Sequence, residues 1–233
     1  MTIDRTARYH VPRYQRDGTD WTVDRAGEPV KALVLHHSAG WYGPKLTASA
    51  SQNAETAQID SLALDHRHRF GIGPGYYYVA FPSGRLYAVG KYGTQRAHTK
   101  GKNPATGNWW NRESLAICAM GNYETDVVPE GLMAALREGI AEVRGYTSAT
   151  IPIYAHGEVP GNPSVSQCPG RHLKACLSAF LANEASQPAP PAVDEARRQV
   201  YRAIDALDAA TVAIASARGD LEVAAAELGR ELA

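Results

Sequence analysis

Two short apolar runs, each ending at a histidine, constrain the fold of this chain more than any other feature. Residues 31–35 precede His36, and residues 151–155 precede His156. Both runs have the length and composition of a buried strand. Because strand ends hold side chains rigidly at one rim of a sheet, we expect both histidines to lie there.

Cys168 adds a third donor, since it opens a Cys-Pro-Gly turn that leads into a predicted helix. Zinc accepts imidazole nitrogen and thiolate sulfur, and a catalytic zinc keeps three protein ligands and one open position for water. His36, His156 and Cys168 therefore predict a hydrolytic Zn²⁺ site rather than a structural one, which would close with a fourth ligand. Taken singly, such a histidine is more often a hydrogen-bonded surface group and such a cysteine a buried thiol.

The segments around these ligands make the prediction specific because of their order along the chain. They are residues 33–39 (LVLHHSA), 75–79 (GYYYV), 83–87 (SGRLY), 97–98 (AH), 111–117 (NRESLAI), His156, and 168–170 (CPG). Together they resemble the zinc-dependent N-acetylmuramoyl-L-alanine amidases, the family that includes phage lysis amidases and the peptidoglycan recognition proteins. The resemblance covers roughly residues 28 to 182. It implies that His36, His156 and Cys168 hold the zinc.

The same resemblance implies a reaction and two catalytic residues. The bond cleaved is the amide between N-acetylmuramic acid and the first L-alanine of the peptidoglycan stem, attacked by zinc-activated water. Tyr76 matches the catalytic tyrosine of the family. Ser166 stands two residues before the cysteine ligand, where relatives carry Lys or Thr, so it is expected to act as a neutral donor.

Further residues are expected to contact the substrate. His98 matches a position that faces the substrate in relatives, although it would serve equally to hold its loop. Residues 99–113 form a long loop, which in a compact domain is usually functional or disordered. Trp109 and Trp110 provide flat aromatic surfaces for a saccharide or peptide, or alternatively close over the core. Asn111 follows them and completes the predicted substrate-binding set.

The rest of the domain reads as alternating strands and helices. Helical periodicity covers residues 49–69 and 129–145 and resumes after Pro169, whereas residues 76–81, 86–89 and 114–120 are strand-like. The hairpin around residues 82–84 must be antiparallel, so the prediction is an α/β fold with a mixed central sheet flanked by helices. Cys118 and Cys176 are expected to pack as small hydrophobes, and His66 to be exposed or to act as a cap.

Composition divides the chain into four parts. Residues 1–27 are predicted to be an N-terminal arm, 28–184 the catalytic domain, and 185–192 a Pro-rich linker. In residues 193–233, apolar residues recur every seven positions with alanines three positions later, which predicts a C-terminal helical element. We expect this element to form a homo-oligomer, to fold back as a helical pair, or to hold the enzyme at the cell wall.

Charge and hydropathy limit which classes of partner the chain is expected to bind and where it is expected to act. The chain has 24 basic and 24 acidic residues, so its net charge is zero and nothing favours nucleic acid as the main partner. We expect no membrane-spanning segment and no secretory signal, because no apolar stretch is long enough and residues 1–5 are mostly polar, and the three cysteines predict no disulfide framework. We expect a phage endolysin that stays in the host cytoplasm until it is released to act on peptidoglycan. The alternatives are a non-catalytic binding module of the same fold and a zinc hydrolase of another amide.

Overall fold

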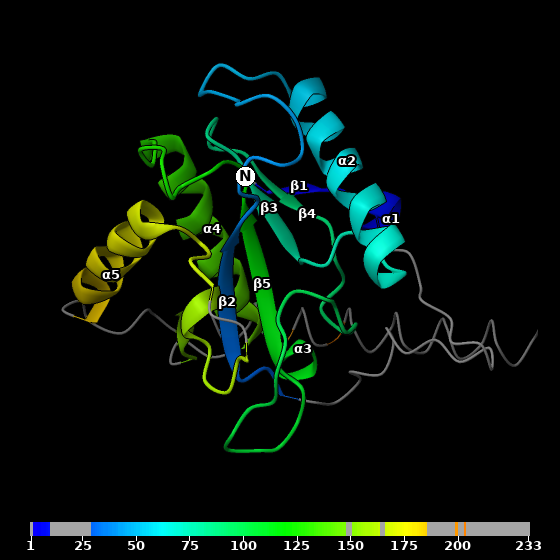
Figure 1. Ribbon diagram of the computed structural model, residues 1–233, viewed down its shortest axis with the longest axis vertical. Coiled ribbons are helices and arrows are strands. Elements are labelled where there is room, and N and C mark those ends of the chain that lie inside the picture. The colour runs from blue at the N-terminus through cyan, green and yellow to red at the C-terminus, as the bar shows by residue number, and fades with distance from the viewer. Residues whose placement is uncertain are drawn as a thin grey trace, which may run out of the picture.

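A mixed sheet forms the centre of the protein, as the sequence predicts, and it has six strands among the described residues (Figure 1). The computed structural model describes residues 2–9, 29–147, 151–163 and 166–185, together with residues 199 and 203. The strand order is β1-β4-β3-β5-β2-β6, and every neighbouring pair is parallel except the β3–β4 hairpin. The strands are β1 (Ile3–Asp4), β2 (Ala32–His37), β3 (Tyr78–Ala80), β4 (Leu86–Ala88), β5 (Ser114–Ala119) and β6 (Ile153–Ala155).

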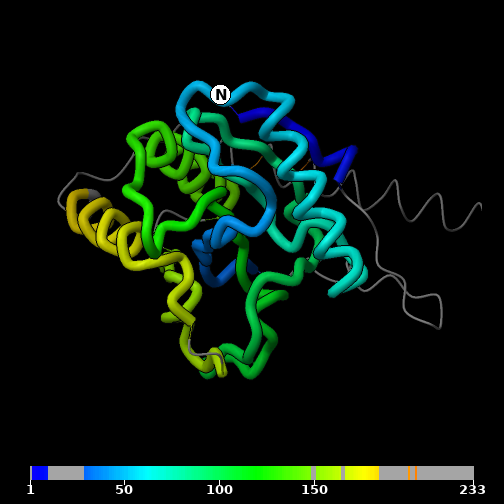
Figure 2. Tube along the Cα trace, turned by 45° about the horizontal axis from the view of Figure 1, so that its top comes forward, coloured from blue at the N-terminus to red at the C-terminus, as the bar shows by residue number. Residues whose placement is uncertain are grey.

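Helices cover both faces of this sheet. On one face, α4 (Glu130–Tyr146) and α5 (Arg171–Ala185) pack on β2, β3 and β5. On the other face, α2 (Gln52–Phe70) packs on β3, β4 and β5, and Figures 1 and 2 show it across the sheet from α4 and α5. The short elements are α1 (Thr6–Tyr9), α3 (Trp110–Glu113) and the 3-10 helix η1 (His156–Glu158).

A buried carboxylate fixes α2 to the hairpin. Glu55, which is fully buried in the first turn of α2, accepts hydrogen bonds from the Ser83 hydroxyl, the Arg85 guanidinium and the Tyr87 hydroxyl. The Arg85 Nε–Glu55 Oε2 distance is 2.6 Å. Because a buried charge is tolerated only when it is paired and hydrogen-bonded, this cluster fixes the position of α2 over the sheet.

The N-terminal residues are part of the sheet. Residues 3 and 4 pair in parallel with β4, and the Tyr9 side chain is buried in the cluster beneath α2. The expected arm therefore begins as an edge strand, because its apolar side chains have a place against β4 and α2. The predicted linker (185–192) and heptad element (193–233) lie outside the described residues, apart from residue 185 and the isolated residues 199 and 203.

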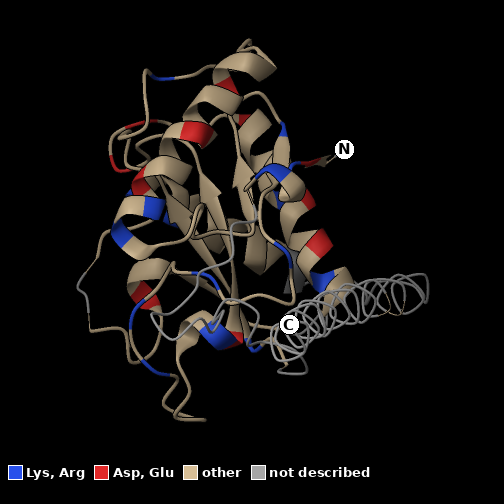
Figure 3. Ribbon diagram, turned by 90° about the vertical axis from the view of Figure 1, so that its right-hand side faces the viewer, with Lys and Arg blue, Asp and Glu red and all other residues tan. Residues whose placement is uncertain are grey.

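Acidic and basic residues are interspersed on the helices seen in Figure 3. Several form ion pairs on the surface, such as Arg8–Asp60 at 2.8 Å and Arg69–Asp65 at 3.2 Å. Within the described ranges, no helix combines the length and the apolar character needed to cross a membrane.

Candidate metal centre

The sheet register brings the two histidines together. Strands β2 and β6 are parallel neighbours with Leu35 opposite Ala155, so His36 and His156 follow from paired positions. Their imidazole ring centroids are 4.4 Å apart. Cys168 reaches them from the turn before α5, and one donor atom from each of the three residues lies within 4.8 Å of the others. The structure thus assembles all three predicted ligands.

The spacing of these donors suits zinc. Cys168 Sγ lies 3.8 Å from His36 Nδ1. A tetrahedral zinc with ordinary bond lengths holds its sulfur and nitrogen ligands about 3.6 Å apart. The donors therefore have the chemistry and separation of a three-ligand zinc site, and no fourth His, Cys, Asp or Glu of the described residues completes the cluster.

Burial sets the protonation of the ligands. It lowers the pKa of His36 well below its ordinary value, and it lowers the pKa of His156 to about 4, so both imidazoles are neutral near pH 7. Burial also raises the pKa of the Cys168 thiol to about 12, although the backbone N–H of His37 donates to Sγ at 3.4 Å. The thiolate form thus requires a nearby cation.

Backbone contacts hold the cysteine loop in place. The Gly157 N–H donates to the Cys168 carbonyl at 2.9 Å, and the Cys168 N–H donates to Ser166 Oγ at 3.1 Å. A side chain at position 157 would collide with the Ser166 carbonyl, so only glycine permits this close approach. Ser166 is therefore adjacent to the site, and its hydroxyl proton is still available to donate a further hydrogen bond.

Tyr76 lies directly beside the metal ligands. Its ring centroid is 5.0 Å from that of His36, at an interplanar angle of 51°. Burial, and then the neighbouring thiols of Cys118 and Cys168, raise the pKa of its phenol well above the ordinary value. The phenol therefore keeps its proton at neutral pH and is hydrogen-bonded to the Cys118 thiol, while its ring lies beside the ligand His36.

His98 and Asn111 support the site. His98 is 7% exposed, with Nδ1 at 3.4 Å from His36 Nε2 and Nε2 at 3.4 Å from the Ser114 carbonyl. Asn111 Oδ1 accepts hydrogen bonds from the backbone N–H groups of His98 and Thr99, both at 3.0 Å. The Asn111 side chain therefore holds the loop, whereas the His98 imidazole lies beside the ligand His36, and its contact with the substrate stays a prediction.

The two tryptophans have different environments. Trp110 is 3% exposed, packs with Val34 and Val159, and donates its indole N–H to the Pro160 carbonyl at 2.6 Å. Its ring belongs to the core, which corrects the expectation of a substrate surface at this position. Trp109 is 54% exposed, with the Lys102 ammonium 5.2 Å from its ring centroid. The loop thus presents Trp109 to solvent.

His66 is a residue whose place the sequence reading missed. We expected an exposed or capping side chain, but His66 is 4% exposed and its ring centroid is 5.3 Å from that of Tyr76. Its spacing of four residues from Leu62 and seven from Ile59 puts it on the buried face of α2. That spacing was the available signal.

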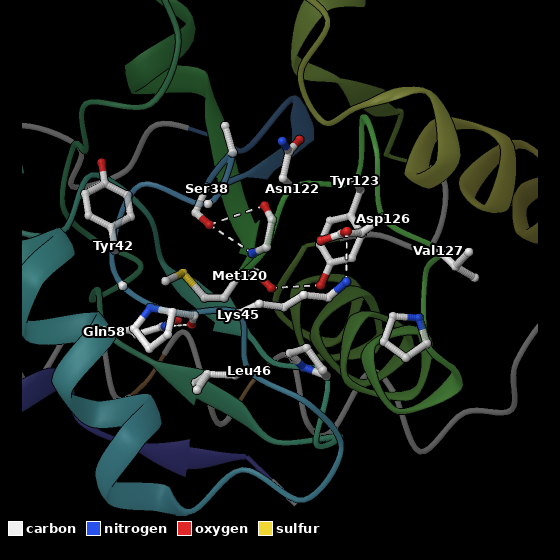
Figure 4. A pocket seen from close by; sticks show the side chains of 17 residues that line it. Ser38, Tyr42, Lys45, Leu46, Gln58, Met120, Asn122, Tyr123, Asp126 and Val127 are labelled. Atoms are coloured by element: carbon white, nitrogen blue, oxygen red, sulfur yellow. Dashed lines mark hydrogen bonds and ion pairs between the residues drawn. The ribbon is translucent and has the colours of Figure 1, made fainter.

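A cavity of about 300 Å³ opens beyond the ends of β2 and β5 (Figure 4). Its walls come from the segments 38–46 and 120–129, with Gln58 and Pro82, and the Lys45–Asp126 ion pair joins the two segments at 2.8 Å. None of the three predicted ligands lines this cavity.

Comparison with known proteins identifies the family. The model of the N-acetylmuramoyl-L-alanine amidase family matches residues 26–171, a range that contains His36, Tyr76, His156 and Cys168. This chain belongs to that family. Among the curated relatives, peptidoglycan-recognition protein SC1a of Drosophila melanogaster is 26% identical over 158 residues, covering 67% of this chain and 76% of that protein. The peptidoglycan recognition protein of Trichoplusia ni is 27% identical over 172 residues, covering 70% of this chain and 82% of that protein.

Solved structures share the fold of this amidase family member. Drosophila PGRP-LB superposes with a TM-score of 0.55 at 20% identity, covering 77% of this chain and 94% of that one. The N-acetylmuramoyl-L-alanine amidase LysC from Clostridium intestinale gives 0.51 at 17% identity, covering 76% and 97%. The ectodomain complex of recognition proteins LCa and LCx, solved with tracheal cytotoxin, gives 0.52 at 22% identity, covering 65% and 82%.

Proposed function

We propose that this protein is a zinc-dependent N-acetylmuramoyl-L-alanine amidase that separates the glycan from the stem peptide of peptidoglycan. The observation that carries the proposal is a three-donor site of His36, His156 and Cys168 with Tyr76 beside it. Three protein ligands leave a coordination position for water, as hydrolytic zinc sites require. Membership of the amidase family supports the choice of bond.

The ligands, Tyr76 and Ser166 would each have a separate role in the reaction. Bound zinc would polarise the scissile carbonyl and lower the pKa of water from about 15.7 toward about 7. His36 and His156 are already neutral, so both imidazole lone pairs are free for the metal. Tyr76 retains its phenolic proton and donates it as a hydrogen bond to the carbonyl oxygen as negative charge develops there. Ser166 adds a neutral donor from the cysteine loop.

Substrate binding would use the exposed aromatic surface of the long loop. Trp109 stands out from the loop, and Lys102 packs its ammonium over the same ring. The loop is held from inside by the Glu113 carboxylate, which accepts hydrogen bonds from Asn103, Thr106 and Asn108. An aromatic face held by a rigid loop suits stacking on a sugar ring or on the stem peptide.

A binding-only module of the same fold is the second candidate, because the curated relatives are named peptidoglycan-recognition proteins. The complete donor set favours catalysis, since a module that only binds has no need of an open zinc position. The third candidate, a zinc hydrolase of another amide, shares the site and differs in the substrate alone.

Digestion of purified peptidoglycan with product masses tests these candidates. An amidase releases stem peptides with free L-alanine amino termini and leaves the glycan strands intact. Cys168→Ser should abolish release, whereas Cys176→Ser, on α5, should not. New reducing ends without free amino termini would show a glycosidase. Pelleting with peptidoglycan without any release would show a binding module.

We further propose phage-induced host lysis as the setting and the 193–233 heptads as a means of dimerisation or wall attachment. The support is the sequence pattern and the resemblance to phage lysis amidases. Light scattering and wall-pelleting on the full chain, compared with a truncation after Gln187, test the second role. If the full chain and the truncated chain are both monomers and pellet equally with cell walls, the heptad element has neither role.

A further inference from the structure

The backbone immediately before Tyr76 is held between two walls. A side chain at Gly75 would meet the Ala97 carbonyl on one side and His66 Nδ1, at 2.9 Å, on the other. A side chain at Gly73 would meet the Ala63 carbonyl of α2 at 2.7 Å. At positions 73 and 75 the turn therefore approaches its neighbours more closely than any residue but glycine allows.

His66 makes the shortest of the polar contacts to this turn. Its Nδ1 accepts a hydrogen bond from the Gly75 N–H at 2.7 Å, in a buried environment. The accepting Nδ1 requires the proton of the neutral ring to be on Nε2, which lies 3.5 Å from the Tyr42 hydroxyl. The same imidazole packs against the Tyr76 ring at 5.3 Å and 52°.

Arg96 holds the carbonyl groups of the same turn. This side chain is fully buried, and its Nη1 donates to the carbonyl of Gly73 at 3.2 Å and to that of Pro74 at 3.4 Å. The turn before Tyr76 thus has its carbonyls fixed by Arg96 and its last N–H fixed by His66. Both the backbone and one ring contact of Tyr76 depend on His66.

We infer that His66 is a positioning residue for the reaction, which sets the direction of the Tyr76 phenol through Gly75 and through ring contact. The inference rests on the proposed function, since it assigns His66 a role through Tyr76. A hydrogen-bond donor must meet a developing charge within tenths of an ångström, and a displacement of 1 Å can reduce the rate by about 100-fold.

The test compares substitutions that keep or remove the acceptor. His66→Asn places its side-chain oxygen where Nδ1 stands, whereas His66→Leu fills the space without an acceptor. We expect His66→Leu to lower kcat on peptidoglycan by about 10- to 100-fold with KM within about twofold, and His66→Asn to recover most of that loss. His68→Leu, at an exposed position on the same helix, is the matched control with unchanged kcat.

A double substitution separates positioning from general destabilisation. Residues that act as a unit are non-additive, so His66→Leu should lower kcat little further in a Tyr76→Phe background. An equal loss in both backgrounds, or full activity of folded His66→Leu, overturns the inference. If His66→Leu does not fold, His66→Gln replaces it, because its amide sits at the ε position and cannot take the place of Nδ1.

Hydrogen exchange at the Gly75 amide tests the contact without any activity. We expect His66→Leu to speed exchange at this amide while zinc content stays at the wild-type value. Unchanged exchange overturns the inference even in an active enzyme. A wild-type protein that binds zinc but hydrolyses no peptidoglycan refutes the proposed function. The positioning role then falls with it, because Tyr76 has no reaction to serve. The exchange rate at Gly75 still reports whether the His66 contact exists, so the two failures are distinguishable.

Discussion

Zinc uptake by the metal-free protein should release one proton at pH 6. Burial lowers the pKa of His156 to about 4 and that of His36 well below its ordinary value, so both ligands are already deprotonated at this pH. Burial raises the pKa of Cys168 to about 12, so the thiol is fully protonated and must lose its proton to bind the metal. Bound water, with a pKa near 7, contributes little at pH 6.

The expected number of protons released per zinc differs clearly from the number that a site with exposed histidines would release. Two histidines with ordinary pKa values of about 6.5 would release about 1.5 protons together at pH 6, giving about 2.5 with the thiol. Ionising the Cys168 thiol at pH 6, with its pKa raised to about 12, costs about 8 kcal/mol. Structural zinc sites bind the metal with about 10–16 kcal/mol near neutral pH even after their thiols have been ionised, so metal binding can supply a cost of this size.

Isothermal titration calorimetry in two buffers of different ionisation enthalpy measures the released protons. We expect one proton per zinc and an affinity that falls about tenfold for each unit of pH decrease between pH 6 and pH 5. Near pH 4 the slope should steepen as His156 becomes protonated. A release near 2.5 protons at pH 6 would refute the argument from burial, and a release of none would exclude the thiol as a ligand. Cys176→Ser should give the wild-type result.

Three further predictions follow from single side chains. Tyr76→Phe should keep its zinc and fold but lose about 10²–10³ in kcat, measured on peptidoglycan with metal content determined in parallel; unchanged kcat would return this tyrosine to a packing role. Glu113→Ala should lower the free energy of unfolding by about 1–3 kcal/mol in urea titrations, because it leaves the buried Asn103 amide without its acceptor, whereas Thr106 and Asn108 are exposed and regain water. Burial raises the pKa of Glu113, but hydrogen bonds from Thr106, Asn108 and Asn103 outweigh it and the net pKa is lowered. This carboxylate therefore contributes stability above its ordinary pKa of about 4.3 that is lost as the pH falls through the lower folded-state value, and a stability difference between wild type and Glu113→Gln that does not shrink below pH 4 would contradict this. Trp109→Ala should weaken peptidoglycan binding in pelleting assays with no change in stability beyond about 0.5 kcal/mol, and equal pelleting would remove the loop from the binding surface.

The sequence by itself determined the elements and the donor set. Apolar runs before His36 and His156 specify strands because only burial in a sheet satisfies such runs, and the ends of these strands carry the predicted ligands. The antiparallel hairpin and the helices at 52–70 and 130–146 follow from turn residues and periodicity in the same way. The ligand prediction needed the ordered motifs as well, since residue types alone recur by chance.

Tertiary structure alone decided which neighbours of the ligands face the site and which support it. Trp109 and Trp110 are adjacent and chemically alike, yet one is exposed and the other buried, because the turn of α3 directs the second ring onto Val34. His66 reads as an ordinary polar residue of a helix, and its contact with Gly75 exists only because the turn at 73–75 passes close to α2. Contacts between segments distant in sequence leave no local pattern, since packing selects for shape and hydrogen-bond geometry rather than for spacing along the chain.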